Sequence, residues 1–296
     1  MSKTAGLSRR ILPPAAFILV FLQAAIVVTG GAVRLTRSGL GCPTWPECTP
    51  GSYTPVPDQA EGQFHAWIEF GNRLLTFVLV VAALITLIAV VKAGRRDLRI
   101  LAAGQVLGIF AQGILGGITV LTDLNPISVA SHYLLSTILI AAATSLYTRR
   151  RLPSIKKISP RAIDIFSRAH VSSAALVVIL GTIVTGAGPH AGDVDSARLK
   201  IAIATAVLMH TIAVVILMVL TIAFFLHRQT SDQSKRLLVI FAIITIGQGA
   251  IGAIQYIQGV PELLVAAHLL GATLVWIGAW KIWLSVQRTQ IADAHA

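Results

Sequence analysis

The chain is a series of long apolar stretches separated by short polar segments. Eight stretches approach or exceed the length of about 20 residues that crosses a hydrocarbon core about 30 Å thick. They cover residues 11–33, 64–91, 98–121, 127–147, 163–185, 197–226, 237–257 and 262–286. Unpaired backbone groups are too costly in lipid, and the stretches are too long and too uniform for barrel strands. The pattern therefore predicts an all-α integral membrane protein with eight transmembrane helices.

Composition agrees with this fold class. Hydrophobic residues make up 55% of the 296 positions and charged residues only 12%, whereas a soluble domain carries about 25% charged residues. The first stretch follows Arg9 and Arg10, as the apolar part of a signal peptide would. Its apolar part is too long for a signal peptide and lacks the usual cleavage site, so we expect a retained helix.

Basic residues favour one side of the predicted membrane. Most of the 24 Lys and Arg residues lie at the termini or in the loops after the second, fourth and sixth stretches. The opposite loops contain only Arg34, Arg37, Arg198 and Lys200. Because cytoplasmic loops are enriched in Lys and Arg, we expect both termini in the cytoplasm and loop 34–63 on the outer face of a bacterial plasma membrane. The net charge of +12 then encodes orientation and contact with anionic lipids, not nucleic-acid binding.

Both cysteines of the chain, Cys42 and Cys48, fall in the first outer loop. The outer compartment permits disulfides, and two nearby cysteines in a loop rich in glycine and proline can close a small ring. We expect a disulfide between them. Its role remains open between a structural staple and a redox-active pair.

The second half of the chain repeats the first. Residues 112–134 align without a gap to residues 248–270, which pairs His132 with His268. A shorter match joins the first and fifth stretches. Four helices per unit restore the same orientation, so the repeat predicts two parallel four-helix halves, residues 1–150 and 151–296.

Glycines recur in the repeated segments, at positions 113, 116, 117, 249 and 252. Their spacing indicates close packing of helices, or a bare backbone against which a flat ligand lies. Four-helix bundles hold ligands between facing helices.

Ionisable residues are rare within membrane spans and usually functional. Four stand out here: Glu69, His132, His210 and His268. By the helical rise, His132 and His268 lie roughly 9–11 Å below the outer helix ends and His210 about 18 Å. Imidazoles on facing helices can supply both axial ligands of a haem iron. We expect His210 and His268 to do so, the alternative being packed polar residues bonded to neighbouring helices.

The second stretch carries further polar residues on one helix face, namely His65, Glu69 and Asn72. Arg73 lies one turn from Glu69 and can pair with it. Two interpretations remain open: a structural Glu–Arg pair, or a carboxylate aimed at a ligand between the second and fourth helices.

The first outer loop and the second stretch carry long motifs. The loop reads Gly-Gly-Ala-Val-Arg-Leu-Thr over 30–36 and Ser-Gly-Leu-Gly-Cys-Pro-x-Trp-Pro-x-Cys over 38–48, and the helix reads Ile-Glu-Phe-x-Asn-Arg over 68–73. With eight spans, repeated halves and paired histidines, the chain resembles the haem A synthase family of cytochrome oxidase assembly enzymes over essentially its whole length.

The resemblance implies an oxidoreductase that converts the C8 methyl group of haem O to a formyl group, giving haem A. It implies a haem b cofactor in the C-terminal half, held through His210 and His268, and haem O in the N-terminal half beside His132 and Glu69. Glu69 would be catalytic by orienting the methyl group, taking a proton or stabilising positive charge at carbon. The two loop cysteines match a cysteine pair of the family.

One departure from the family pattern concerns the substrate side. The family motif commonly reads Glu-x-x-His-Arg, but this chain has Asn72 in place of the histidine. Either His132 alone binds the substrate iron, or His65 substitutes from two turns away, or Asn72 contacts the iron weakly.

The expected partners are haem O and the lipid bilayer, together with haem O synthase and cytochrome oxidase assembly factors by family analogy; a homo-oligomer remains open, and no nucleic acid is expected. Two other functions compete. A bis-histidine membrane cytochrome b that transfers electrons is expected to carry two complete histidine pairs. A secondary transporter explains the repeats but not haem binding.

Overall fold

A computed structural model of the chain describes residues 3–150, 154–156 and 158–290. The long helices in these residues are α1 (Lys3–Leu35), α2 (Gln63–Lys92), α3 (Arg99–Leu121), α4 (Pro126–Thr148), α5 (Arg161–Ala187), α6 (Ile203–Leu226), α7 (Asp232–Ile257) and α8 (Glu262–Gln287). All eight are long and apolar enough to cross a membrane, which confirms the predicted fold class. A short 3-10 helix, η1 (Arg96–Leu98), precedes α3.

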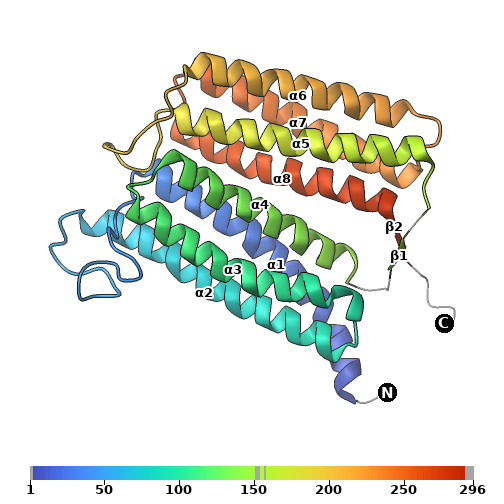
Figure 1. The fold of residues 1–296 in the computed structure, drawn as a ribbon, viewed down its shortest axis with the longest axis horizontal. Coiled ribbons are helices and arrows are strands. Elements are labelled where there is room, and N and C mark those ends of the chain that lie inside the picture. The colour runs from blue at the N-terminus through green and yellow to red at the C-terminus, as the bar shows by residue number, and fades with distance from the viewer. Residues whose placement is uncertain (1–2, 151–153, 157, 291–296) are drawn as a thin grey trace.

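A small sheet supplements the helices and was not predicted. Strand β1 (Ser154–Lys156) pairs antiparallel with β2 (Arg288–Gln290), with Ile155 opposite Thr289. The sheet lies outside the eight spans and ties the segment before α5 to the end of α8 (Figure 1).

Local sequence explains several helix ends. The Asn125 side chain accepts a hydrogen bond from the Ile127 amide at 2.9 Å, and Pro126 occupies the first turn of α4, where its missing N–H costs nothing. Ser231 caps α7 in the same way by accepting from the Ser234 amide. These caps fix where α4 and α7 begin.

The predicted start of the sixth span, near residue 197, was wrong. Helix α6 begins at Ile203, because the preceding segment folds back and the Leu199 amide bonds to the Gly186 carbonyl at 2.9 Å. The later start places His210 about two helical turns into the helix, roughly 10 Å by the helical rise and not 18 Å.

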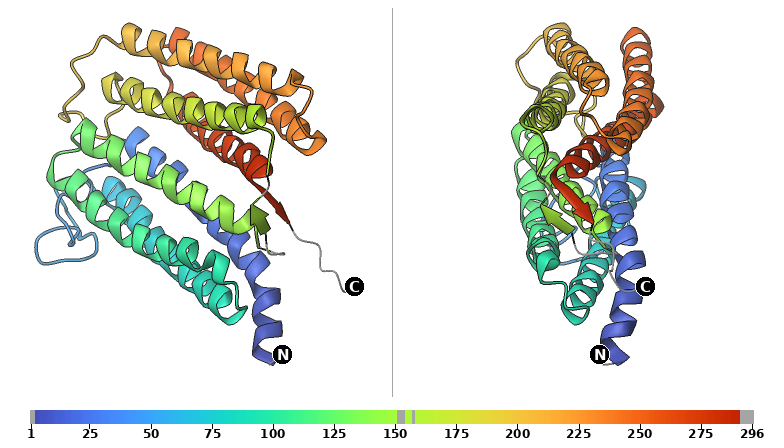
Figure 2. Two further views of the ribbon diagram at one scale, coloured as in Figure 1. Left: turned by 45° about the vertical axis from the view of Figure 1, so that its right-hand side comes forward. Right: turned by 90° about the vertical axis from the view of Figure 1, so that its right-hand side faces the viewer.

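The helices form two sets of four (Figures 1 and 2). In the N-terminal set, α1 packs against α2 and α4, and α3 packs against α2 and α4. The C-terminal set repeats this ring, with α5 and α7 each beside α6 and α8. Helices α2 and α4 therefore lie diagonally opposite, as do α6 and α8.

The seam between the two sets runs along α4 and α8, with α1 and α5 also in contact with the facing set. The Trp276 indole donates to the Thr137 carbonyl at 2.7 Å, and the Trp280 indole donates to the Ser145 hydroxyl at 2.8 Å. Each indole N–H is thus satisfied across the seam, as a low-dielectric environment requires.

Large apolar side chains cover the outside of the helices. Phe77, Leu107, Ile216 and Ile243 are all exposed, on four different helices. A soluble monomer rarely exposes so much apolar surface, so this surface supports a membrane environment.

The loops poor in Lys and Arg gather at one end of the helices (Figure 1). We call it the outer end; it consists of residues 36–62, 122–125, 188–202 and 258–261. Helix α1 begins and α8 ends at the opposite end, as an even number of spans requires.

Candidate functional site

Three histidines of the spans share one type of packing. Each places its ring against a glycine of a neighbouring helix: His132 against Gly116, His210 against Gly181, and His268 against Gly252. A Cβ atom at these glycines would lie only 3.3, 3.4 and 3.3 Å from the ring carbon Cε1, respectively. Glycine therefore makes room for each ring, a role that the sequence pattern alone did not reveal.

The ring of His210 is also fixed by a hydrogen bond. Its Nδ1 atom lies 3.1 Å from the carbonyl oxygen of Val177, one turn before Gly181 on α5. A neutral imidazole that donates from Nδ1 keeps a lone pair on Nε2. Metal-binding histidines are commonly oriented by such a bond to a backbone carbonyl, so His210 fits an axial iron ligand.

His268 repeats this orientation from α8. Its ring faces the backbone of Gln248, one turn before Gly252, without completing a hydrogen bond. The Nδ1 atom of His268 is buried and has no partner among the described residues. Because Nδ1 faces α7, as Nδ1 of His210 faces α5, the nitrogen of His268 left available to a bound group is Nε2.

His210 and His268 lie at matching depths on the diagonally opposite helices α6 and α8. Each is about two turns from the outer start of its helix. Within the described residues, no group of three or more His, Cys, Asp or Glu side chains could hold a bare metal ion. Two imidazoles instead fit a metal that brings its own equatorial ligands, as in a porphyrin.

His132 occupies the corresponding position in the N-terminal set. Its Nδ1 atom is likewise buried without a partner. Gln112, one turn before Gly116, donates to the His132 carbonyl at 3.0 Å and to the Ser136 hydroxyl at 2.6 Å. These bonds hold the backbone of α4 against α3 at the level of the ring.

The two other polar residues considered for the substrate side have partners elsewhere. The Thr29 hydroxyl donates to Oδ1 of Asn72 at 2.7 Å. The ring of His65 forms a 2.9 Å hydrogen bond with the Ser38 hydroxyl. Both side chains therefore hold α2 against α1 and the first outer loop, and their contact with a substrate stays a prediction.

Glu69 is buried, with 6% of its surface exposed. Its Oε2 accepts from the Cys42 amide at 2.7 Å, and its Oε1 accepts from Nη2 and Nε of Arg73 at 2.6 and 3.1 Å. The Glu–Arg pair that the sequence left open is thus present. The carboxylate is fixed by three hydrogen bonds, two of them from a cation.

Arg73 extends this pair into the first outer loop. Its guanidinium also donates to the carbonyls of Cys42, Thr44 and Glu47 at 2.8, 3.2 and 3.1 Å. Sequence reasoning missed these bonds, because backbone acceptors have no signature in a motif. One guanidinium therefore joins the carboxylate to the chain around the cysteines.

The predicted disulfide is confirmed. Cys42 and Cys48 are bonded at 2.05 Å, and neither is exposed to solvent. Between them, the Trp45 indole lies against Gly117 of α3, where a side chain would collide with it. The loop is therefore anchored on α2, which carries Glu69, and on α3, which faces His132.

The chain is similar to known proteins. Residues 15–193 match the COX15-CtaA family, described as cytochrome oxidase assembly protein. Proteins named Heme A synthase are similar to the chain. The one from Geobacillus thermodenitrificans is 32% identical over 40% of this chain and 36% of its own length. The one from Shewanella oneidensis is 30% identical over 54% and 51%, and the one from Azorhizobium caulinodans is 26% identical over 89% and 90%. The chain thus covers about a third of the first relative, half of the second and nine-tenths of the third.

Proposed function

Because the chain belongs to the COX15-CtaA family of cytochrome oxidase assembly proteins, we propose that it is a haem A synthase, which oxidises the C8 methyl group of haem O to a formyl group. The similarity to a protein of this name along 89% of the chain supports the activity. The observation that carries the proposal is the arrangement of imidazoles. One set of helices presents two at matching depth, and the other presents one at the repeat-related position.

The C-terminal set would hold haem b between α6 and α8 through His210 and His268. When bound, haem b supplies one-electron redox chemistry. The chain contributes the orientation of the ligands. The Val177 carbonyl favours the tautomer of His210 whose Nε2 lone pair is free, and Gly181 and Gly252 leave space for the two rings.

The N-terminal set holds haem O, with His132 as its protein ligand. On the diagonally opposite helix α2, Asn72 is bonded to Thr29, and His65 lies in the first turn at the outer end, bonded through Nδ1 to Ser38, whereas His132 lies almost two turns into α4. His132 alone therefore binds the substrate iron from the protein. We therefore propose the first of the three possibilities that the missing family histidine leaves open.

The substrate methyl group would be converted in two successive hydroxylations, each a two-electron oxidation that adds one oxygen atom and needs an external oxidant to accept the electrons. The first gives an alcohol, and the second gives a gem-diol that loses water to leave the formyl group. Glu69 is the proposed catalytic carboxylate. Its oxygens are held in place by Cys42 and Arg73, so Glu69 can accept a proton or stabilise positive charge at the carbon without reorganising.

The setting follows from the fold and the family. The chain is a multi-pass membrane protein, and we place it in a bacterial plasma membrane with both termini in the cytoplasm and the Cys42–Cys48 loop outside. Haem O synthase, which would deliver the substrate, and assembly factors of cytochrome oxidase are the proposed partners.

The proposed function is tested by producing the protein in cells that make haem O but no haem A, followed by chromatography of extracted haems. Haem A is the expected product. A cytochrome b that only transfers electrons would bind haem b without forming haem A, and a transporter would carry no haem. Either outcome would remove the synthase assignment.

A further inference from the structure

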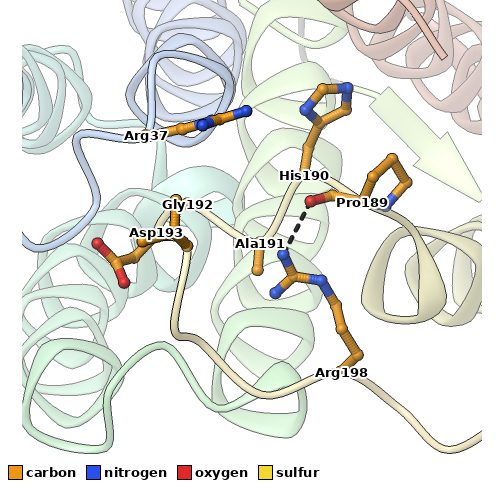
Figure 3. Close-up of a pocket in the computed structure, with 8 residues that line it drawn as sticks. Arg37, Pro189, His190, Ala191, Gly192, Asp193 and Arg198 are labelled. Atoms are coloured by element: carbon orange, nitrogen blue, oxygen red, sulfur yellow. Dashed lines mark hydrogen bonds between the residues drawn. The ribbon is translucent and has the colours of Figure 1, made fainter.

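A basic pocket of about 210 Å³ lies at the outer end of the seam. Arg37 reaches it from the end of α1, and His190 and Arg198 line it from the loop between α5 and α6 (Figure 3). Arg34 lies beside it, with its Cγ atom 3.6 Å from where a side chain would begin at Gly192. Residues from both sets of helices therefore form this pocket.

The pocket carries more positive than negative charge, because Arg37 and Arg198 line it together with a single acidic residue, Asp193. Within the described residues, Arg34, Arg37 and Arg198 form no ion pair with an acidic side chain. Arg198 donates to the carbonyls of Pro189 and Ser196, at 2.8 Å each. Three cations near one another at the edge of a low-dielectric region repel, and such groups are usually paired.

One further polar group, on Arg34, indicates that a partner is missing. Nη2 of Arg34 donates to the Thr185 carbonyl at 2.8 Å, but its Nε is buried and has no partner in the described part of the chain. The carboxylate of Asp193, the acidic residue that lines the pocket, instead accepts from the Asp195 amide. An anion placed here would compensate the guanidinium charge that Asp193 does not pair.

The pocket adjoins the helix that carries one proposed haem ligand. Nε2 of His190 lies 2.7 Å from the carbonyl oxygen of Val260, just before α8 begins. His268 lies about two turns further along α8, roughly 9 Å inward by the helical rise. A porphyrin carries its two carboxylates on one edge, and binding of a carboxylate in this pocket requires that edge to face the outer end.

We propose that Arg37 and Arg198 bind a propionate carboxylate of the porphyrin held by His210 and His268. This inference rests on the proposed function, since it needs a haem in the C-terminal set. Guanidinium groups recognise carboxylates with two parallel hydrogen bonds. Because Arg37 follows directly after α1, the N-terminal half thereby contributes to the cofactor site of the C-terminal set.

The test compares two ligands and three forms of the full chain. Protein from haem-deficient cells is titrated in detergent with iron protoporphyrin and with its dimethyl ester, and binding is followed by the Soret band. The variant carries Arg37→Gln and Arg198→Gln. The matched control is Lys200→Gln, which removes an exposed positive charge from the same loop.

We expect esterification to weaken binding to the wild type and to the Lys200→Gln control by about tenfold or more, the usual effect of losing hydrogen bonds to a charged group. The double variant should bind the free acid about as weakly as the wild type binds the ester. Esterification should not weaken the binding of the double variant any further. Its binding of the ester should match that of the wild type, which also shows that the variant is folded.

Other outcomes would overturn the inference. An equal loss on esterification in wild type and double variant would show that the carboxylates lie elsewhere. The same titration is repeated in phosphatidylcholine vesicles with and without phosphatidylglycerol. If the double variant binds the free acid more weakly than the wild type only where phosphatidylglycerol is present, the pocket binds a lipid phosphate instead. Failure of the wild type to bind either porphyrin would instead end the proposed function itself.

Discussion

The guanidinium of Arg73 bonds the Glu69 carboxylate at 2.6 Å and the Cys42 carbonyl at 2.8 Å through the same nitrogen, Nη2. The amide of Cys42 in turn donates to the other oxygen of Glu69. The proposed catalytic carboxylate and the disulfide loop are thus parts of one hydrogen-bonded unit, so their positions depend on each other.

Replacing Arg73 by Gln should therefore damage both the loop and the fold. It leaves a buried carboxylate without its cation, a change that costs about 3–5 kcal/mol. Thermal unfolding in detergent should shift strongly downward, and the disulfide should become accessible to a reductant. The control is Arg168→Gln, an exposed member of an i,i+4 pair with Asp164, where about 0–1 kcal/mol is expected. Equal shifts in both variants would show that the Glu69–Arg73 unit does not hold the loop.

The Glu69 carboxylate itself is tested by Glu69→Ala and Glu69→Gln. If the carboxylate takes a proton or stabilises charge, both variants should lower haem A formation by about 10²–10⁴-fold, with an alcohol intermediate accumulating. Haem b should remain bound, because its ligands are on α6 and α8. Normal haem A output from Glu69→Gln would reduce Glu69 to a structural anchor.

The glycines beside the histidine rings provide a matched series. Gly252→Ala on α7 should displace His268 and reduce the haem b content of the purified protein, because the added carbon lies 3.3 Å from the ring. Gly249→Ala on the same helix meets nothing within 4 Å and should retain haem b. Haem b content is measured by pyridine haemochrome. Equal retention by the two variants would contradict the assignment of His268 as a ligand.

A second imidazole on α2 should change the substrate site. In Asn72→His, the new ring would lie on the helix diagonally opposite His132, without the hydrogen bond from Thr29. We expect haem O bound by the wild type to show a high-spin spectrum and to bind carbon monoxide. The variant should shift towards low spin with weaker carbon monoxide binding. A low-spin wild type would show that another group already completes the coordination.

Much of the architecture could be predicted from the sequence, because crossing a bilayer requires a minimum apolar length and excludes open strands. The start of α6 could not, since residues 197–202 are partly apolar and only the bond from Leu199 to Gly186 shows that the chain turns there. The pairing of β1 with β2 depends on segments far apart in the chain and leaves no local pattern.

The candidate site, like the fold, could be predicted from the sequence only in part. The repeat in the sequence singled out His132 and His268, because related positions in two halves have related environments. The packing of each ring on a glycine, and the bonds of Arg73 to loop carbonyls, depend on the register between elements. The sequence could predict that Glu69 and Arg73 pair, but not that this pair anchors the loop.

The central claim is that His210 and His268 together bind a haem iron between α6 and α8. It is tested most directly by the absorption spectrum of the purified protein, with chromatography of its extracted haem, for the wild type, His210→Ala and His268→Ala. The account predicts a low-spin haem b spectrum in the wild type and loss of that haem in either variant. A wild type without a Soret band after reconstitution with haem, or variants that keep the low-spin spectrum, would contradict it.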